Sequence, residues 1–167
     1  REPVLERLLE ASSLLPDGLR LVLVEGYRPP KLQVEYFEEY CGELRATDGS
    51  LTEDEVHRLA SRYISPPEVA PHCAGAAVDV TLFSDDGVEL DLGTPVNATP
   101  EETDGRIYTH HPDVTGEARA LRKTLSEALE RAGFVNYATE WWHWSYGDRY
   151  WAQATGADQA RFGAIEL

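Results

Sequence analysis

The stretch from Pro71 to Phe83 constrains the fold most, because it combines an apolar residue at every second position from residue 76 with a single charged side chain, Asp79. Read as a β-strand from residue 76, it has one apolar face that suits a protein core. Asp79 falls on the opposite face, in a sequence otherwise suited to burial. A lone buried carboxylate is unfavourable, so Asp79 needs a metal, a cation or hydrogen bonds. The residues of the core-facing row are Ala76, Val78, Val80 and Leu82.

Two imidazoles and two carboxylates are available from this stretch and one distant segment. His72 lies seven residues before Asp79, and Glu140 lies three residues before His143. Catalytic zinc usually takes three protein ligands and leaves a fourth position for water, whose proton a further carboxylate accepts. The sequence therefore predicts a zinc site with His72, Asp79 and His143 as ligands and Glu140 as the general base.

The segment from Glu140 to Tyr146 is rich in aromatic residues and is predicted to be a strand. In a flat strand, Glu140 and His143 would face opposite sides, because they are three residues apart. Both can reach one metal only if the strand is bent or bulged, or if Glu140 lies just before it.

A third element, Glu25 to Pro30, follows an apolar run and precedes a helical pattern. A strand, a sharp turn and a helix are expected there, with Arg28 at the end of the strand. A guanidinium in that position can hold a substrate carboxylate or the oxyanion that forms when water attacks an amide.

Structural roles are the alternative for each residue taken alone: His72 as a strand cap, Asp79 as a partner of Arg28, and His143 as a core histidine. The conjunction of H-x6-D, E-x-x-H and an arginine turn favours the catalytic interpretation. The aromatic run from Trp141 to Tyr146 is interpreted as core and pocket wall. A formal net charge of −15 disfavours nucleic-acid binding.

The other histidines and the cysteines have structural interpretations. His110 and His111 lie in a polar loop, where either could contact the site, and His57 is expected on a helix surface. Cys41 and Cys73 do not form a disulfide framework, and Cys73 is interpreted as a buried thiol, with an opportunistic ligand as the alternative.

These motifs resemble those of the VanX-type D-alanyl-D-alanine dipeptidases, in the M15 zinc peptidases. Related families are the VanY-type D,D-carboxypeptidases and, at the level of the fold, the hedgehog signalling domain. The family patterns and the segments that match them are S-x-H-x-x-G-x-A-x-D at 70–79, E-W-W-H at 140–143, Y-R-P at 27–29, and the D-M-G loop at 91–94.

The resemblance implies one Zn²⁺ per chain, held by His72, Asp79 and His143. It implies that Glu140 is the base and later the proton donor to the leaving amine, and that Arg28 stabilises the tetrahedral intermediate. The implied substrate is D-Ala-D-Ala or a close D-amino-acid peptide. The alternatives are a D,D-carboxypeptidase acting on longer peptidoglycan stems and a non-enzymatic zinc-binding interaction domain.

Three departures from the family pattern concern the substrate specificity and the N-terminal extent of the chain. Asn97 stands where the dipeptidases carry an aspartate for the substrate's amino group, and Ala70 stands where they carry a serine. Losing an acidic partner for an ammonium weakens selection for a free N-terminus. The family's N-terminal segment is expected to be missing ahead of Arg1.

Length and element order indicate one zinc D,D-peptidase domain over residues 1–167, with an α+β fold and a mostly antiparallel central sheet flanked by helices. A cytoplasmic location is expected, without a membrane partner, and the oligomeric state is left open. The long loop from Asp91 to Val114 is interpreted as a functional rim. The expected helices are 3–14, 30–44, 52–63 and 116–132, and the expected strands are 19–25, 76–83, 134–137 and 140–146.

Overall fold

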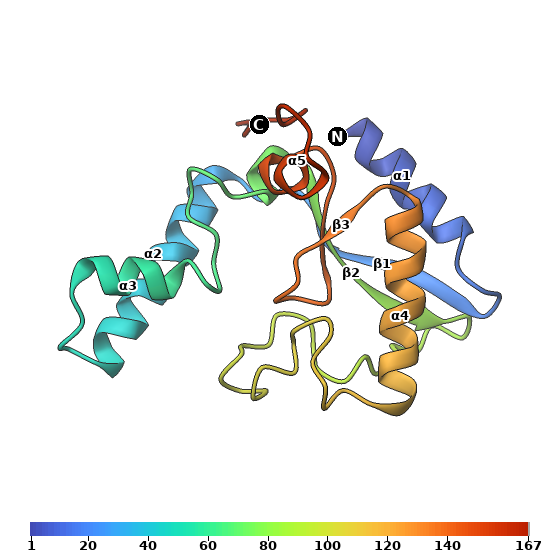
Figure 1. The fold of residues 1–167 in the computed structure, drawn as a ribbon, viewed down its shortest axis with the longest axis horizontal. Coiled ribbons are helices and arrows are strands. Elements are labelled where there is room, and N and C mark those ends of the chain that lie inside the picture. Colours follow the sequence, from blue (N-terminus) through green and yellow to red (C-terminus); the bar gives the residue numbers. More distant parts are fainter. Residues whose placement is uncertain (167) are drawn as a thin grey trace.

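The computed structural model describes residues 1–166 and has an antiparallel sheet flanked by helices (Figure 1). The sheet has four strands in the order β1-β2-β4-β3, and each neighbouring pair is antiparallel. The α+β prediction is therefore confirmed. The elements in chain order are α1 (Glu2–Ser13), β1 (Leu19–Glu25), α2 (Pro30–Thr47), α3 (Glu53–Ala60), the 3-10 turn η1 (His72–Ala74), β2 (Ala77–Ser84), α4 (Gly116–Arg131), β3 (Val135–Asn136), β4 (His143–Ser145) and α5 (Arg149–Thr155).

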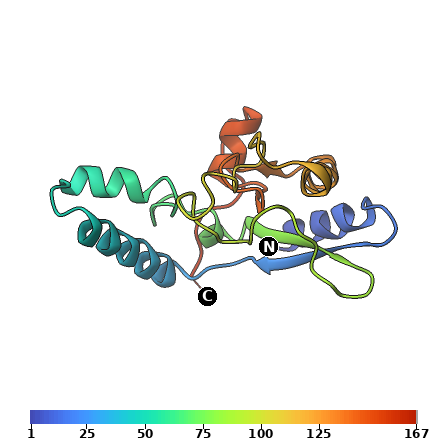
Figure 2. The ribbon, with the colours of Figure 1, turned by 90° about the horizontal axis from the view of Figure 1, so that it is seen from below.

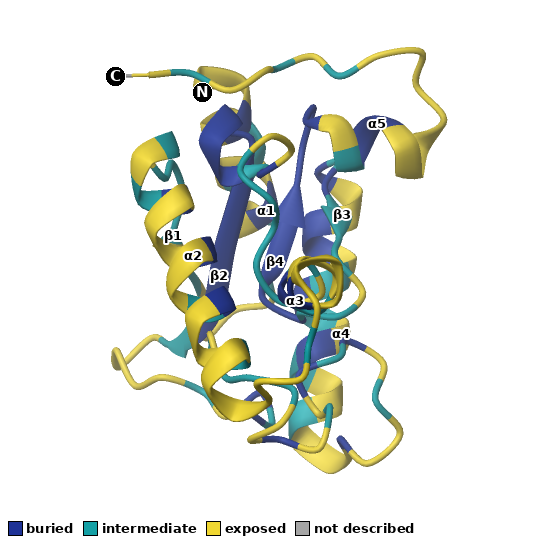
Figure 3. Ribbon diagram, turned by 90° about the vertical axis from the view of Figure 1, so that its left-hand side faces the viewer, coloured by how far each residue is buried: buried dark blue, intermediate teal, exposed yellow. Residues whose placement is uncertain are grey.

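Strand β2 is the centre of the fold, and its alternation is the one the sequence predicts. Val78, Val80 and Leu82 lie in the main core together with residues of α1 and α4. Asp79 lies on the opposite face and is also buried. Figure 3 shows β2 and β4 as the most thoroughly buried strands. The metal-site face therefore rests on a rigid apolar layer.

Helices α2 and α3 form a pair that extends away from the sheet (Figures 1 and 2). They pack on a small cluster of their own, built from Phe37 and Cys41 of α2 and from Val56 and Ala60 of α3. Thr52 begins α3 with a capping box, in which its side chain and that of Glu55 bond each other's backbone N–H groups. Helix α2 and the segment after α3 form one wall of the cleft described below.

The structure differs from the sequence prediction in two elements near the C-terminus. Strand β4 begins at His143, so the predicted strand was wrong over residues 140–142, which form a turn. The backbone N–H of His143 donates to the Glu140 carbonyl at 3.2 Å and closes this turn. Helix α5 was not predicted, although Asp148 caps it by accepting a hydrogen bond from the backbone N–H of Trp151 at 2.8 Å.

The long loop over residues 91–114 is held by a buried arginine on α4. Arg122 is 3% exposed, and its Nε and Nη1 atoms donate to the carbonyls of Leu92 and Tyr108 at 2.7 and 2.9 Å. Cys41 and Cys73 are free and buried. Over residues 1–166, no helix is long and apolar enough to cross a membrane.

Candidate metal centre

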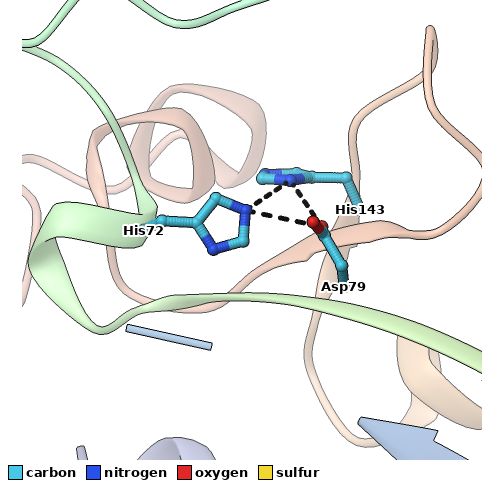
Figure 4. A group of neighbouring side chains, drawn as sticks. All are labelled: His72, Asp79 and His143. Carbon is cyan, nitrogen blue, oxygen red and sulfur yellow. Dashed lines mark hydrogen bonds and ion pairs between the residues drawn. The ribbon is translucent and has the colours of Figure 1, made fainter. Parts of the chain in front are cut away.

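Three buried side chains converge at one end of the sheet (Figure 4). His72 lies on η1, Asp79 on β2 and His143 on β4, where Asp79 and His143 are directly opposite each other in the strand pair. The Nδ1 atom of His143 lies 3.0 Å from Asp79 Oδ1 and 3.2 Å from His72 Nε2. The Nε2 atom of His72 lies 3.4 Å from the same oxygen of Asp79. The three donor atoms thus form a nearly equilateral triangle.

This donor triangle has the size that a zinc ion requires. Zinc bonds to imidazole nitrogen and carboxylate oxygen are about 2.0–2.1 Å long, so tetrahedral ligand atoms lie about 3.3 Å from one another. The observed separations of 3.0, 3.2 and 3.4 Å are all close to that value. Two imidazoles with one carboxylate are also a ligand set found in catalytic zinc sites. The residues therefore fit a zinc ion.

The orientation of the His72 ring is set by the turn between β1 and α2. Its Nδ1 atom lies 2.8 Å from the carbonyl oxygen of Gly26, an acceptor that requires Nδ1 to carry the proton. Nε2 is then left with its lone pair toward Asp79 and His143, as metal ligation needs. The backbone N–H of Arg28 donates back to the His72 carbonyl at 3.2 Å.

Hydrogen bonding within the triangle determines the charge of its carboxylate. Burial by itself raises the pKa of Asp79, but the hydrogen bond from His143 and the adjacent imidazole of His72 outweigh it and hold the pKa well below the usual range. Burial lowers the pKa of His143, whereas the hydrogen bond to Asp79 raises it, with a net increase. Asp79 is thus an anion, the form in which a carboxylate binds a metal.

Glu140 lies beside the triangle, in the turn before β4. Its Oε2 atom is 3.9 Å from Nδ1 of His143, and its side chain is 13% exposed. Burial raises the pKa of Glu140 to about 7 in the metal-free chain, and the negative charge of Asp79 acts in the same direction. A carboxylate with this pKa can accept and return a proton near neutral pH.

Arg28 lies in the turn between β1 and α2, and its side chain is 15% exposed. Its Nε atom donates to Glu25 at 2.7 Å, and its Nη1 atom donates to Gln33 at 2.9 Å. Burial lowers the pKa of Arg28, but the hydrogen bond and charge of Glu25 raise it by more, so the side chain is cationic. It is the positive group that faces the carboxylates of Asp79 and Glu140.

All five predicted residues line one cleft with a volume of about 990 Å³. Asn97 lines it too, so the departure from the family pattern lies at the site itself. His57, His110 and His111 are not among its lining residues, and Cys73 is fully buried outside it. The remaining walls are rich in tyrosine, contributed by Tyr36, Tyr40, Tyr63, Tyr137 and Tyr150.

Sequence reasoning missed two residues that contact Arg28. Glu25 was noted only as part of the turn, and Gln33 was not singled out. The available signal was helical spacing, since Gln33, Phe37 and Cys41 are four residues apart and form the buried stripe of α2. A polar residue in such a stripe needs a partner, and here that partner is Arg28.

Sequence comparisons identify the family of the chain. A family model described as D-Ala-D-Ala dipeptidase, Peptidase M15, matches residues 1–159. A D-alanyl-D-alanine dipeptidase of Synechocystis sp. is 28% identical, over 91% of this chain and 70% of the relative. The enzyme of the same name from Enterococcus faecium is 30% identical, over 86% of this chain and 70% of the relative.

A solved structure has a similar fold. VanYB in complex with D-alanine-D-alanine superposes with a TM-score of 0.52 at 20% identity, over 96% of this chain and 77% of the other. The match of the dipeptidase family model to nearly the whole chain confirms the resemblance noted in the sequence. The chain therefore belongs to the Peptidase M15 family of D-Ala-D-Ala dipeptidases.

Proposed function

We propose that the cleft hydrolyses D-Ala-D-Ala with one zinc ion held by His72, Asp79 and His143. As a member of the D-Ala-D-Ala dipeptidase family, the chain is a zinc metallopeptidase. The observation that carries the residue assignment is the triangle of buried donor atoms, spaced 3.0–3.4 Å apart, with a spare carboxylate 3.9 Å from one of them. A zinc-binding interaction domain would need neither Glu140 nor Arg28.

Bound zinc supplies Lewis acidity, which makes water a nucleophile near neutral pH and polarises the scissile carbonyl. Glu140 accepts the proton of the attacking water and passes it to the departing amine, a shuttle for which a pKa of about 7 is well matched. Its Oε2 atom lies 3.9 Å from Nδ1 of His143, beside the proposed zinc ligands.

Arg28 stabilises the negative charge that develops on the carbonyl oxygen. A guanidinium has five N–H groups. Within residues 1–166, three of them donate to Glu25 and Gln33, so the side chain is fixed while two N–H groups stay free for the substrate. A fixed cation needs no reorganisation as the charge develops, which is the condition for electrostatic catalysis.

An assay of D-Ala-D-Ala hydrolysis, in which the amount of D-Ala released is measured, tests this proposal. The zinc-loaded protein is expected to cleave the dipeptide, to lose activity with a chelator and to regain it with zinc. Glu140→Gln is expected to lower kcat by about a hundredfold or more while zinc binding persists. Glu130→Gln, an exposed glutamate of α4, is the matched control. Full activity of Glu140→Gln would show that the base is another group.

A D,D-carboxypeptidase activity on longer stem peptides is the second candidate. It is favoured by Asn97 in the cleft wall, which offers no negative charge to a free amino group, and by a cleft volume of about 990 Å³. Comparing kcat/KM for free D-Ala-D-Ala with that for an N-acylated peptide ending in D-Ala-D-Ala distinguishes the two. Preference for the acylated peptide would assign the carboxypeptidase activity.

A further inference from the structure

Arg28 is held from three sides. Its Nε and Nη2 atoms donate to the two oxygens of Glu25, and its Nη1 atom donates to Oε1 of Gln33 at 2.9 Å. The guanidinium also lies over the ring of Tyr36, with 5.2 Å between the guanidinium carbon and the ring centroid. Of these partners, Glu25 has a side chain that is 26% exposed, so it is itself only partly fixed.

Gln33 differs from the other partners because it is buried and bonded at both ends. It is 1% exposed, and its Nε2 atom donates to the carbonyl oxygen of Ser65 at 2.7 Å. Arginine has only donors and a carbonyl only accepts, so the orientation of the amide is determined by its partners. Both polar ends of the Gln33 side chain are therefore used, and neither can change partner without a loss.

The position of Gln33 connects the site to a second segment of the cleft wall. Gln33 lies in the first turn of α2, where its backbone N–H donates to the Pro29 carbonyl at 3.1 Å. Ser65 lies in the segment after α3 and lines the same cleft. Through one side chain, the start of α2, the segment after α3 and the guanidinium of Arg28 are held in a common arrangement.

We propose that Gln33 is a positioning residue for the hydrolysis, which holds the guanidinium of Arg28 at the angle that transition-state stabilisation requires. The inference rests on the proposed function of Arg28. A free arginine side chain has several rotatable bonds. If Glu25 were its only hydrogen-bond partner, the Arg28 and Glu25 side chains could move together as a pair. Gln33 anchors Nη1 to the backbone of Ser65 and removes that freedom. Such an anchor acts on kcat rather than on substrate affinity.

A double-mutant cycle tests this coupling with zinc-loaded protein and D-Ala-D-Ala. Gln33→Met is expected to lower kcat about 10- to 100-fold and to change KM by less than about twofold, as for a small misplacement of a catalytic group. In an Arg28→Ala background the same substitution is expected to change kcat by less than about twofold, because the group that it positions is gone. Gln159→Met, at an exposed position of the C-terminal segment, is the matched control.

Two outcomes of the cycle would overturn the proposal. One is an equal loss of kcat from Gln33→Met with and without Arg28. The other is unchanged kcat in Gln33→Met while Arg28→Ala is impaired. If Gln33→Met does not fold, Gln33→Asn replaces it in the cycle with the same expected results, because the shorter side chain stays polar and uncharged but cannot reach both Arg28 and Ser65.

A measurement independent of turnover separates this proposal from the proposed function. The Nη1–H resonance of Arg28, whose acceptor is Gln33, is expected to exchange slowly with water in the wild type and in Gln159→Met, and at least tenfold faster in Gln33→Met. Unchanged exchange in Gln33→Met would overturn the positioning role. Absence of D-Ala-D-Ala hydrolysis by the zinc-loaded wild type would overturn the function instead, and the exchange result would still decide whether Gln33 holds Arg28.

Discussion

The Nδ1 atom of His72 lies 2.8 Å from the carbonyl oxygen of Gly26, in the turn that also carries Arg28. The backbone N–H of Arg28 donates to the His72 carbonyl at 3.2 Å, so the two turns bind each other reciprocally. A proposed metal ligand and a proposed oxyanion partner are thereby fixed together. Their relative placement depends on one hydrogen bond from the His72 side chain and one between backbone atoms.

Zinc is expected to stabilise the folded chain strongly, because its three proposed ligands are already assembled. A ligand present at a thousandfold excess over its Kd adds about 4 kcal/mol to the free energy of unfolding. For a chain of this length that corresponds to a rise in Tm of about 10 °C. Differential scanning fluorimetry with chelator and then zinc measures it. Asp79→Asn is expected to abolish the rise in Tm, and the exposed control Asp158→Asn is expected to keep it. An equal rise in both variants would contradict the assignment of Asp79 as a zinc ligand.

The metal-free chain is expected to lose stability as Glu140 ionises. Burial raises its pKa from 4.5 to about 7, so between these values the folded state binds more protons than the unfolded state. The free energy of unfolding then falls as pH rises through this window, by up to about 3 kcal/mol.

Urea denaturation of chelated wild type and Glu140→Gln at pH 5 and pH 8 measures this effect. The variant has no charge to bury, so its stability relative to wild type should increase from pH 5 to pH 8. If the free energies of unfolding of wild type and Glu140→Gln differ by the same amount at both pH values, the ionisation of Glu140 is not the source of the difference. Glu130→Gln is the exposed control.

Arg122 is expected to be essential for the loop over residues 91–114. Burial lowers the pKa of Arg122 to about 10, and the guanidinium is satisfied by the carbonyls of Leu92, Arg106 and Tyr108. Arg122→Met leaves these buried carbonyls without donors and should lower the free energy of unfolding by about 3 kcal/mol. The exposed neighbour Lys123 provides the control, since Lys123→Met should change the free energy of unfolding by less than about 0.5 kcal/mol. Equal urea midpoints for both variants would exclude this role.

Asn97 is expected to determine how well the cleft selects a free amino group. It lines the cleft and has a φ of 63°, a left-handed conformation that asparagine and aspartate both tolerate. Asn97→Asp therefore adds a negative charge without new backbone strain. The ratio of kcat/KM for D-Ala-D-Ala to that for N-acetyl-D-Ala-D-Ala should rise about tenfold, through charge-assisted hydrogen bonding to the ammonium. An unchanged ratio would place the amino group elsewhere.

Local periodicity was sufficient to predict the central strand and most of the helices. The apolar alternation of β2 depends only on neighbouring residues, and it correctly placed Asp79 opposite the core row. Helix α2 begins at Pro30, as the turn and the proline indicated. Helix α5 was missed because seven residues are too few to show a recognisable helical periodicity.

The sequence by itself determined the family, the α+β fold and the five residues to test, because motif chemistry and strand alternation are written in short stretches of chain. Only the tertiary structure decided how Glu140 and His143 reach one site. The backbone N–H of His143 donates to the Glu140 carbonyl and closes a turn, so β4 begins three residues after Glu140 and no bulge is needed. The anchoring of Arg28 by Gln33 was likewise decided in three dimensions, since it depends on a carbonyl 32 residues away along the chain.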